Sequence, residues 1–271
     1  MIISCLVENT SLKGLETEHG LSIHIQTEDG RSLLFDTGQS GKLLIQNALA
    51  MGIDLSEVDL LVISHGHYDH GGGIQSFLEA NQKAPVFIRK DAFEPHYSIH
   101  EDGPHDIGLT RSLKDHPRIR LVERDVLDLE GGLKLFTTPR GGHDAPPGSI
   151  RMRKGDDLMT DDFSHEMCLG IKEGKKCVLF SGCAHRGILN IMDRAERLLG
   201  TSPTHVIGGM HLKDGDPDGP FIKDLSEGLL RFPNTRYLTC HCTGEEVFCR
   251  LKALMKDKIR YLSTGMSVNL T

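Results

Sequence analysis

The stretch Val58-Asp59-Leu60-Leu61-Val62-Ile63-Ser64-His65-Gly66-His67-Tyr68-Asp69-His70 decides how this chain of 271 residues is expected to fold. Residues 58–63 are mostly apolar and rich in β-branched side chains, which is typical of a short buried strand. Four side chains that can bind a metal follow within six residues, and a run of glycines, residues 71–73, comes directly after them. Imidazole and carboxylate groups at this density can hold one or two divalent ions. Because open α/β sheets build their sites at the carboxyl ends of strands, the stretch predicts a metal-binding histidine loop (residues 65–70).

The overall composition is that of an ordinary globular protein. Hydrophobic residues make up 38% and charged residues 25%, and 31 Lys and Arg against 38 Asp and Glu give a net charge of −7. Without a basic run, neither nucleic acid nor a membrane surface is an expected partner. The N-terminus lacks the basic flank and cleavage site of an export signal, and the seven cysteines form no C-x-x-C pair. We therefore expect a cytoplasmic protein with reduced thiols, and the oligomeric state is left open.

Further apolar runs alternate with segments of helical periodicity along the chain. The expected strands outside residues 58–63 are 2–7, 21–26, 32–35, 118–122, 133–137, 167–171, 177–180, 205–207 and 236–239. Hairpins as well as crossover connections indicate a mixed α/β architecture rather than a purely parallel sheet. No Pro/Ser-rich linker divides the chain, so a single domain, residues 1–271, is expected.

Two stretches break this pattern. Residues 91–117 are polar and contain four histidines, of which His96 and His100 are expected on a solvated surface. An interruption of this length predicts a lid or a functional insertion. A second irregular stretch, residues 138–162, is rich in glycine and proline.

Several residues outside the histidine loop also suggest site chemistry. Asp36 ends the strand 32–35 and is expected to hydrogen-bond a metal-binding histidine or to cap the next helix. Cys183 with His185, and later His241, also follow strands and precede helices. The N-terminal N–H groups and positive dipole ends of those helices favour an anion as well as a metal.

Two arginines are candidates for binding a phosphate. Arg140 and Arg186 lie in glycine-flanked turns, where a guanidinium can make two parallel hydrogen bonds to a phosphate group. Two ordinary surface arginines are the alternative.

The motifs together resemble those of a known family. H-x-H-x-D-H after a strand, preceded by F-D-T-G at residues 35–38, is similar to the signature of the metallo-β-lactamase superfamily of metal-dependent hydrolases. S-G-C-A-H-R-G (181–187), G-G-M-H-L (208–212) and C-H-C-T-G (240–244) resemble the branch of 7,8-dihydropterin-6-methyl-4-(β-D-ribofuranosyl)aminobenzene 5′-phosphate synthase. The resemblance implies an αβ/βα four-layer sandwich of two mixed sheets flanked by helices, with a site at one rim between the sheets.

The resemblance also implies a site with two metal ions, each held by side chains that follow strands. The implied ligands are His65 and His67 for the first ion, and Asp69, His70 and His241 for the second, with Asp36 as the bracing carboxylate.

Three further positions depart from the family pattern or complete it. For the missing ligand of the first ion the candidates are His143, His165 and His185, and His185 is preferred because it follows a buried strand and opens a helix. Cys183 stands where many members have a bridging aspartate, and is either a soft ligand or a small buried residue. His211 is expected to contact the substrate or to support a ligand.

The function implied by this resemblance is that of a metal-dependent hydrolase, or a related lyase or synthase, acting on a small anionic and phosphorylated substrate. Two divalent ions, zinc first and manganese or iron as alternatives, would supply a hydroxide near neutral pH. Asp69 would additionally transfer a proton. A nuclease or phosphodiesterase of the same superfamily is the first alternative, although a net charge of −7 disfavours a nucleic-acid substrate. A non-catalytic metal- or ligand-binding protein is the second, favoured only by Cys183.

Overall fold

The computed structural model describes residues 1–11, 14–139, 141–146, 150–155 and 157–270. The chain divides into two compact units. Unit 1 comprises Met1–Glu123, Gly148–Met167 and Ser263–Thr271, and unit 2 comprises Arg124–Pro147 and Cys168–Leu262. Each unit has a mixed sheet and a hydrophobic core, so the predicted mixed α/β architecture is confirmed. The single domain over residues 1–271 stays a prediction.

Unit 1 contains a sheet with the strand order β18-β1-β2-β3-β4-β5-β8. Its strands are β1 (Ile2–Val7), β2 (Ser22–Gln26), β3 (Ser32–Phe35), β4 (Leu60–Val62), β5 (Val86–Arg89), β8 (Ile119–Val122) and β18 (Ser267–Asn269). The turn at Asp29 and Gly30 joins β2 and β3 as an antiparallel hairpin, whereas β3, β4, β5 and β8 pair in parallel. Parallel neighbours need crossover connections, and these supply the helices of the unit.

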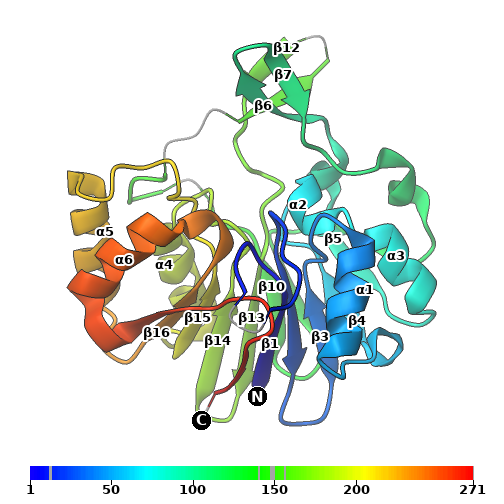
Figure 1. Ribbon diagram of the computed structural model, residues 1–271, viewed down its shortest axis with the longest axis horizontal. Helices are drawn as coiled ribbons and strands as arrows, with labels where there is room; N and C mark the ends of the chain where they lie inside the picture. The colour runs from blue at the N-terminus through cyan, green and yellow to red at the C-terminus, as the bar shows by residue number, and fades with distance from the viewer. Residues whose placement is uncertain (12–13, 140, 147–149, 156, 271) are drawn as a thin grey trace. The chain divides into compact units, whose positions relative to one another are not determined.

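The helices of unit 1 are α1 (Gly41–Ala50), α2 (Tyr68–Gly71) and α3 (Ile74–Ala80), with short 3₁₀ segments at η1 (Leu55–Glu57), η2 (Lys90–Phe93) and η3 (Arg111–Asp115). The Ser40 side chain caps α1 by accepting from the Leu43 N–H. Leu44 of α1 and Phe77 of α3 are fully buried in one core cluster with Leu34, Leu61 and other strand residues. Figure 1 shows α1 and α3 side by side along these strands. This packing fixes the carboxyl end of β4, where the histidine loop begins.

Unit 2 contains a sheet with the strand order β17-β16-β15-β14-β13-β10-β9. Its strands are β9 (Val126–Leu129), β10 (Leu133–Phe136), β13 (Cys168–Glu173), β14 (Lys176–Phe180), β15 (His205–Gly208), β16 (Arg236–Thr239) and β17 (Ile259–Tyr261). Its helices are α4 (Ile188–Leu199), α5 (Pro220–Leu230) and α6 (Glu245–Met255), with η4 (His241–Thr243) and η5 (Lys256–Lys258). Buried Met192, Leu229 and Leu251 bring one residue of each helix into a common core with Leu179 and Tyr237 of the sheet.

The two stretches predicted as irregular form β structure with each other, all within unit 1. β6 (His96–His100) and β7 (Gly103–Asp106) come from the first stretch, and β11 (Arg151–Lys154) and β12 (Asp157–Thr160) from the second. They make a small sheet with the order β12-β11-β6-β7, whose strands lie together in Figure 1. The prediction of irregular structure was wrong here because strand pairing across about 50 residues leaves little local signal in polar segments. A lid function for residues 91–117 stays a prediction.

The two large sheets share a pattern that the sequence did not reveal. Among the described strands, each sheet runs through three antiparallel pairs followed by three parallel pairs. β3, β4 and β5 of unit 1 therefore correspond to β14, β15 and β16 of unit 2. No described helix is long and apolar enough to cross a membrane.

Candidate metal site

The histidine loop connects β4 to α2 in unit 1. Its His65, His67, Asp69 and His70 are all buried, with at most 8% of any of them exposed. Gly66 allows this path, because a Cβ there would lie 2.3 Å from the Ala92 carbonyl oxygen. A glycine is therefore required where the loop passes η2.

Asp36 and Ser64 determine which nitrogens of the loop histidines carry protons. The Asp36 carboxylate accepts from the Ser64 N–H and hydroxyl, both at 2.7 Å, and from His70 Nδ1 at 2.7 Å. The Ser64 hydroxyl has only one proton, and it donates this proton to Asp36. Its oxygen therefore accepts from His65 Nδ1, which lies 2.8 Å away. In both histidines Nδ1 carries the proton, and Nε2 is the nitrogen that can bind a metal. The hydrogen bond predicted for Asp36 is present, and its part in metal binding stays a prediction.

The other two metal-capable residues of the loop are also held in place. Burial lowers the pKa of His67 well below its ordinary value, with the charge of His165 as the next cause, so this imidazole is neutral at neutral pH. Asp69 Oδ2 lies 3.1 Å from His19 Nε2 and 3.8 Å from His70 Nε2. His19 Nδ1 lies 3.3 Å from the Asn9 amide nitrogen, which can only donate, so His19 donates to Asp69 through Nε2. His19 is a site contact that the sequence did not suggest.

In unit 2 the metal-capable residues lie on the loops that follow β14, β15 and β16. Ligand atoms of Cys183, His185 and His211 lie within 4.8 Å of one another, as do those of Cys183, His241 and Cys242. The structure therefore places Cys183 among groups that can bind a metal. Cys242 is an addition that the C-H-C spacing alone did not single out.

Cys242 also binds the backbone of a neighbouring loop. Its sulfur accepts from the His211 N–H at 3.1 Å and lies 3.8 Å from the Cys183 carbonyl oxygen. Burial alone would raise the pKa of the Cys242 thiol, but contacts with Cys183 and His211 bring it well below its ordinary value. Cys242 therefore links the loops that follow β14, β15 and β16.

Backbone strain accompanies the loops of both units. Asp36 has a φ of 61°, Ala184 of 54°, and His211 and His241 each of 52°. A residue other than glycine in this left-handed region costs about 1–3 kcal/mol, and such residues cluster at functional sites. The strain supports the assignment of these loops as functional.

The three candidates for the last ligand of the first ion lie in different surroundings. His165 uses both nitrogens: Nδ1 accepts from the Gly66 N–H at 2.9 Å, and Nε2 lies 3.2 Å from Asp161 Oδ2. His143 Nε2 lies 3.0 Å from Asp193 Oδ2. His185 is 97% buried, with its ring 4.2 Å from that of His211. Because both nitrogens of His165 contact other groups and His143 lies beside Asp193, these contacts favour His185. Its role as a ligand stays a prediction.

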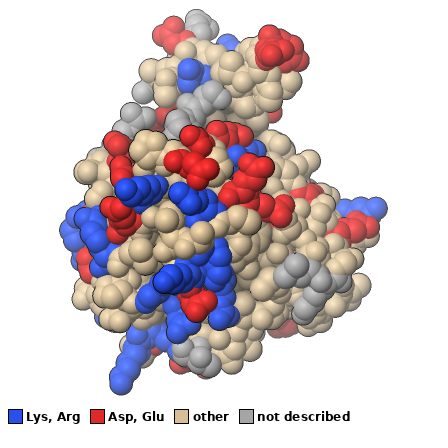
Figure 2. All heavy atoms as spheres, turned by 60° about the vertical axis from the view of Figure 1, so that its left-hand side comes forward, with Lys and Arg blue, Asp and Glu red and all other residues tan. Residues whose placement is uncertain are grey.

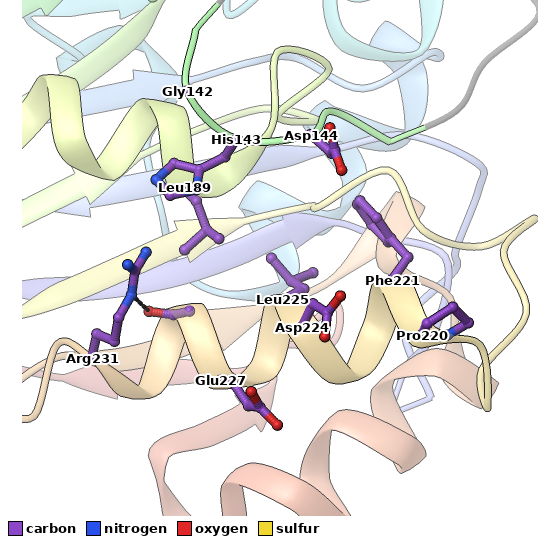
Figure 3. Close-up of a pocket in the computed structure, with 11 residues that line it drawn as sticks. Gly142, His143, Asp144, Leu189, Pro220, Phe221, Asp224, Leu225, Glu227 and Arg231 are labelled. Atoms are coloured by element: carbon purple, nitrogen blue, oxygen red, sulfur yellow. Dashed lines mark hydrogen bonds between the residues drawn. The ribbon is translucent and has the colours of Figure 1, made fainter.

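His143 lines a cavity of about 810 Å³ in unit 2. Figure 3 shows His143 and Asp144 on one side and Phe221, Asp224 and Arg231 of the α5 region on the other. Because Asp144, Asp224 and Glu227 line this cavity with a single arginine, its charge does not favour an anionic ligand.

The two arginines predicted to bind phosphate have different outcomes. Arg140 lies outside the described residues. Arg186 is half-buried, and its guanidinium donates to the Thr138 carbonyl oxygen within unit 2. Phosphate binding by either arginine stays a prediction.

His96 differs from its prediction. Expected on a solvated surface, it is fully buried, and Asp161, 65 residues away, lies 2.7 Å from its Nδ1. The expectation was wrong because β6 pairs with β11, which brings the two distant segments together. His100, on the same strand, is exposed as predicted.

The donor set fits a metal centre. Metal-binding histidines are usually held by a hydrogen bond from one ring nitrogen to a carboxylate or another oxygen, and His65 and His70 are buried with Nδ1 in such contacts. The structure thus contains clusters of His, Asp and Cys that can hold a metal ion.

Comparison with known proteins agrees with the fold. The chain belongs to the metallo-beta-lactamase superfamily, whose sequence profile matches residues 17–185.

Particular relatives extend the match over nearly the whole chain. This chain is 26% identical to 7,8-dihydropterin-6-methyl-4-(beta-D-ribofuranosyl)-aminobenzene-5′-phosphate synthase of Methanocaldococcus jannaschii. The alignment covers 92% of this chain and 89% of that protein. An uncharacterised protein of the same organism is 28% identical over 93% and 94% of the two chains. The crystal structure of Tm1679, a metal-dependent hydrolase of the beta-lactamase superfamily, shares 27% identity with a TM-score of 0.85, covering 100% and 99% of the two chains. The predicted metallo-β-lactamase fold is thereby confirmed.

Proposed function

We propose that this protein is a metal-dependent hydrolase, or a related lyase or synthase, that acts on a small anionic, phosphorylated substrate. The observation that carries the proposal is the histidine loop. Its ligands are buried, and Asp36 and Ser64 place the protons of His65 and His70 on Nδ1. Partners of this kind orient a histidine for metal binding and make its other nitrogen a stronger ligand.

The proposed cofactors are two divalent ions, zinc in the first place. The proposed ligands remain His65, His67, Asp69, His70, His185 and His241. Bound ions of this kind lower the pKa of water and stabilise negative charge that develops on a substrate oxygen.

Asp69 is the proposed proton carrier. Its Oδ2 lies 3.1 Å from His19 Nε2, a contact that restricts the orientation of the carboxylate. A carboxylate fixed in this way can accept a proton from the nucleophile and pass it to the leaving group.

Two observations support an anionic substrate. α4 begins after Gly187, two residues beyond His185, and its first turn has neither an acidic residue nor a capping side chain. The N–H groups of such a turn are available to bind an anion. In addition, the name of the synthase relative describes a 5′-phosphate product.

A nucleic-acid substrate is the first alternative. It needs a basic track along the protein surface. On the face shown in Figure 2, Lys and Arg side chains lie next to Asp and Glu side chains rather than forming a field of one sign. With the net charge of −7, this favours a small substrate.

The test combines metal analysis with a substrate panel. Protein loaded with zinc or manganese is assayed on phosphomonoesters, phosphodiesters and lactones. Asp69→Asn is expected to lower kcat/KM about 10²–10⁴-fold, because it removes the proton carrier and a ligand. Asp59→Asn is the matched control, because Asp59 is an exposed carboxylate at the opposite end of β4.

The outcomes separate the alternatives. A metal-loaded protein that turns over none of these compounds, with Asp69→Asn altering nothing, would leave the non-catalytic binding protein as the better assignment. Turnover of the phosphodiesters in preference to the other compounds would favour the nuclease or phosphodiesterase.

A further inference from the structure

A second group of metal-capable side chains lies beside the histidine loop, within unit 1. It consists of His96 at the start of β6, Asp161 just after β12, and His165. His96, Asp161 and His165 are fully buried, and their ligand atoms lie within 4.8 Å of one another and of a His67 nitrogen.

Asp161 determines the proton positions in this group. Its Oδ1 accepts from the Phe163 N–H at 2.7 Å, and its Oδ2 lies 2.7 Å from His96 Nδ1 and 3.2 Å from His165 Nε2. Burial alone would raise the pKa of Asp161, but the hydrogen bonds from His165 and His96 bring it well below its ordinary value. A carboxylate can only accept, so both histidines donate to it.

The two histidines therefore have different roles. His165 donates through Nε2 and accepts the Gly66 N–H on Nδ1, which ties Asp161 to the backbone of the histidine loop. His96 donates through Nδ1, so its Nε2 has a lone pair. This Nε2 is buried, and among the described residues it has no hydrogen-bond partner.

The ring geometry suits a shared ion. Two imidazoles that bind one zinc ion at about 2.1 Å place their ring centroids roughly 5 Å apart. The His67 and His96 centroids are 5.6 Å apart, and those of His65 and His67 are 4.5 Å apart.

We propose that His96 is an additional metal ligand, which binds through Nε2 to the ion held by His67, and that Asp161 orients it. The inference rests on the proposed function, because it needs His67 to bind a metal. Asp161 holds His96 as Asp36 holds His70: in both pairs a buried carboxylate lies 2.7 Å from Nδ1.

The topology of the sheets supports this assignment. His96 follows β5 and the 3₁₀ segment η2, and His241 begins η4 directly after β16. β5 and β16 hold corresponding places in their sheets. In each unit a histidine thus lies beyond the third of the corresponding parallel strands, where α/β sheets place their sites.

The decisive variant is His96→Asn. The asparagine amide nitrogen takes roughly the place of Nδ1 and can still donate to Asp161, whereas Nε2 is removed. His100→Asn is the matched control, because His100 lies on the same strand with an exposed side chain. Three quantities are measured: the Zn²⁺ affinity of the metal-free protein against a chromophoric chelator, the visible spectrum of the Co²⁺-loaded protein, and the unfolding temperature in EDTA.

We expect His96→Asn to weaken one Zn²⁺ site about 10–100-fold and to change the Co²⁺ bands, with the unfolding temperature in EDTA unchanged. Asp161→Asn should weaken the same site by a similar factor, as the loss of an orienting partner typically does. His100→Asn should change none of the three quantities.

The failure of this inference differs from the failure of the proposed function. Wild-type protein that binds no divalent ion would refute both. Wild-type protein that binds metal, with His96→Asn retaining its affinity and Co²⁺ spectrum, would refute the His96 assignment alone. If His96→Asn does not fold, Asp161→Asn decides, and an unchanged zinc affinity there overturns the proposal.

Discussion

The loops after β3, β4 and β5 in unit 1 can be compared with those after β14, β15 and β16 in unit 2, because the two sheets run through the same series of pairings. In unit 1, Asp36 and Asp161 each hold a histidine through Nδ1. In unit 2, a hydroxyl and a thiol hold the loop backbone: the Met210 N–H donates to Thr243 Oγ1 at 3.0 Å, and the His211 N–H to Cys242 Sγ.

The difference concerns how strongly each set of loops is fixed. A hydrogen bond to a charged group contributes about 1.5–3 kcal/mol, against about 0.5–1.5 kcal/mol between neutral groups. Loops held by carboxylates should therefore be more costly to disrupt than loops held by hydroxyls. Three substitutions test this comparison.

Replacement of the unit 1 carboxylate should have the largest effect. Asp36→Ala leaves three buried donors without their acceptor: the Ser64 N–H, the Ser64 hydroxyl and His70 Nδ1–H. We expect the metal-free protein to lose about 3–5 kcal/mol of unfolding free energy in urea titrations. Glu57→Ala, which removes an exposed ion pair with Lys83, should cost less than about 1 kcal/mol. Similar losses in both variants would contradict the structural role of Asp36.

The corresponding change in unit 2 should cost less. Thr243→Val keeps the shape of a fully buried side chain but removes the acceptor for the Met210 N–H and the 2.6 Å contact with Thr239 Oγ1. The expected loss is about 1–3 kcal/mol, measured in the same urea titration. Thr201→Val, on an exposed residue, is the control. If Thr243→Val proved as costly as Asp36→Ala, the proposed difference between the units would be wrong.

Substitution of His24, a buried histidine that contacts a hydroxyl, should change the unfolding free energy least and serves as the reference for the two larger effects. Burial lowers the pKa of His24 to about 4, and its Nε2 lies 2.8 Å from the Ser32 hydroxyl oxygen. In the unfolded chain a histidine protonates near pH 6.5, so stability is complete above that pH and falls as the pH decreases toward 4.

At pH 5.5, His24 should account for a loss of about 1 kcal/mol of unfolding free energy relative to neutral pH. The measurement is the difference in unfolding free energy between pH 7.5 and pH 5.5, for wild type and His24→Gln. The variant should lose about 1 kcal/mol less than wild type over this interval, and equal losses would show that His24 does not resist protonation.

Local pattern was sufficient to predict much of this protein. The run at residues 58–63 contains the core of β4, and the dense H-x-H-x-D-H spacing identified a loop whose ligand side chains are all buried. The role of Asp36 could also be predicted, because its place at a strand end before Thr37 and Gly38 suggested a bracing carboxylate. These signals are short in range, so they can be found without knowledge of the pairing of distant segments.

His96 shows where this approach stops. Its neighbours in sequence form no apolar run, and its hydrogen-bond partner Asp161 is 65 residues away. His19 beside Asp69 is a second case, because the contact spans 50 residues and no motif includes His19. Neither side chain differs in its local sequence from a solvated histidine.

The sequence by itself thus determined the mixed α/β class, the histidine loop and the family resemblance, because hydrophobic periodicity and ligand spacing are local properties of the chain. The tertiary structure decided which histidine nitrogens carry protons, that His165 binds the Gly66 backbone, and that His96 lies beside His67. Proton placement depends on which acceptor lies within hydrogen-bond distance. That distance is set by strand pairing and helix packing between segments far apart in the chain.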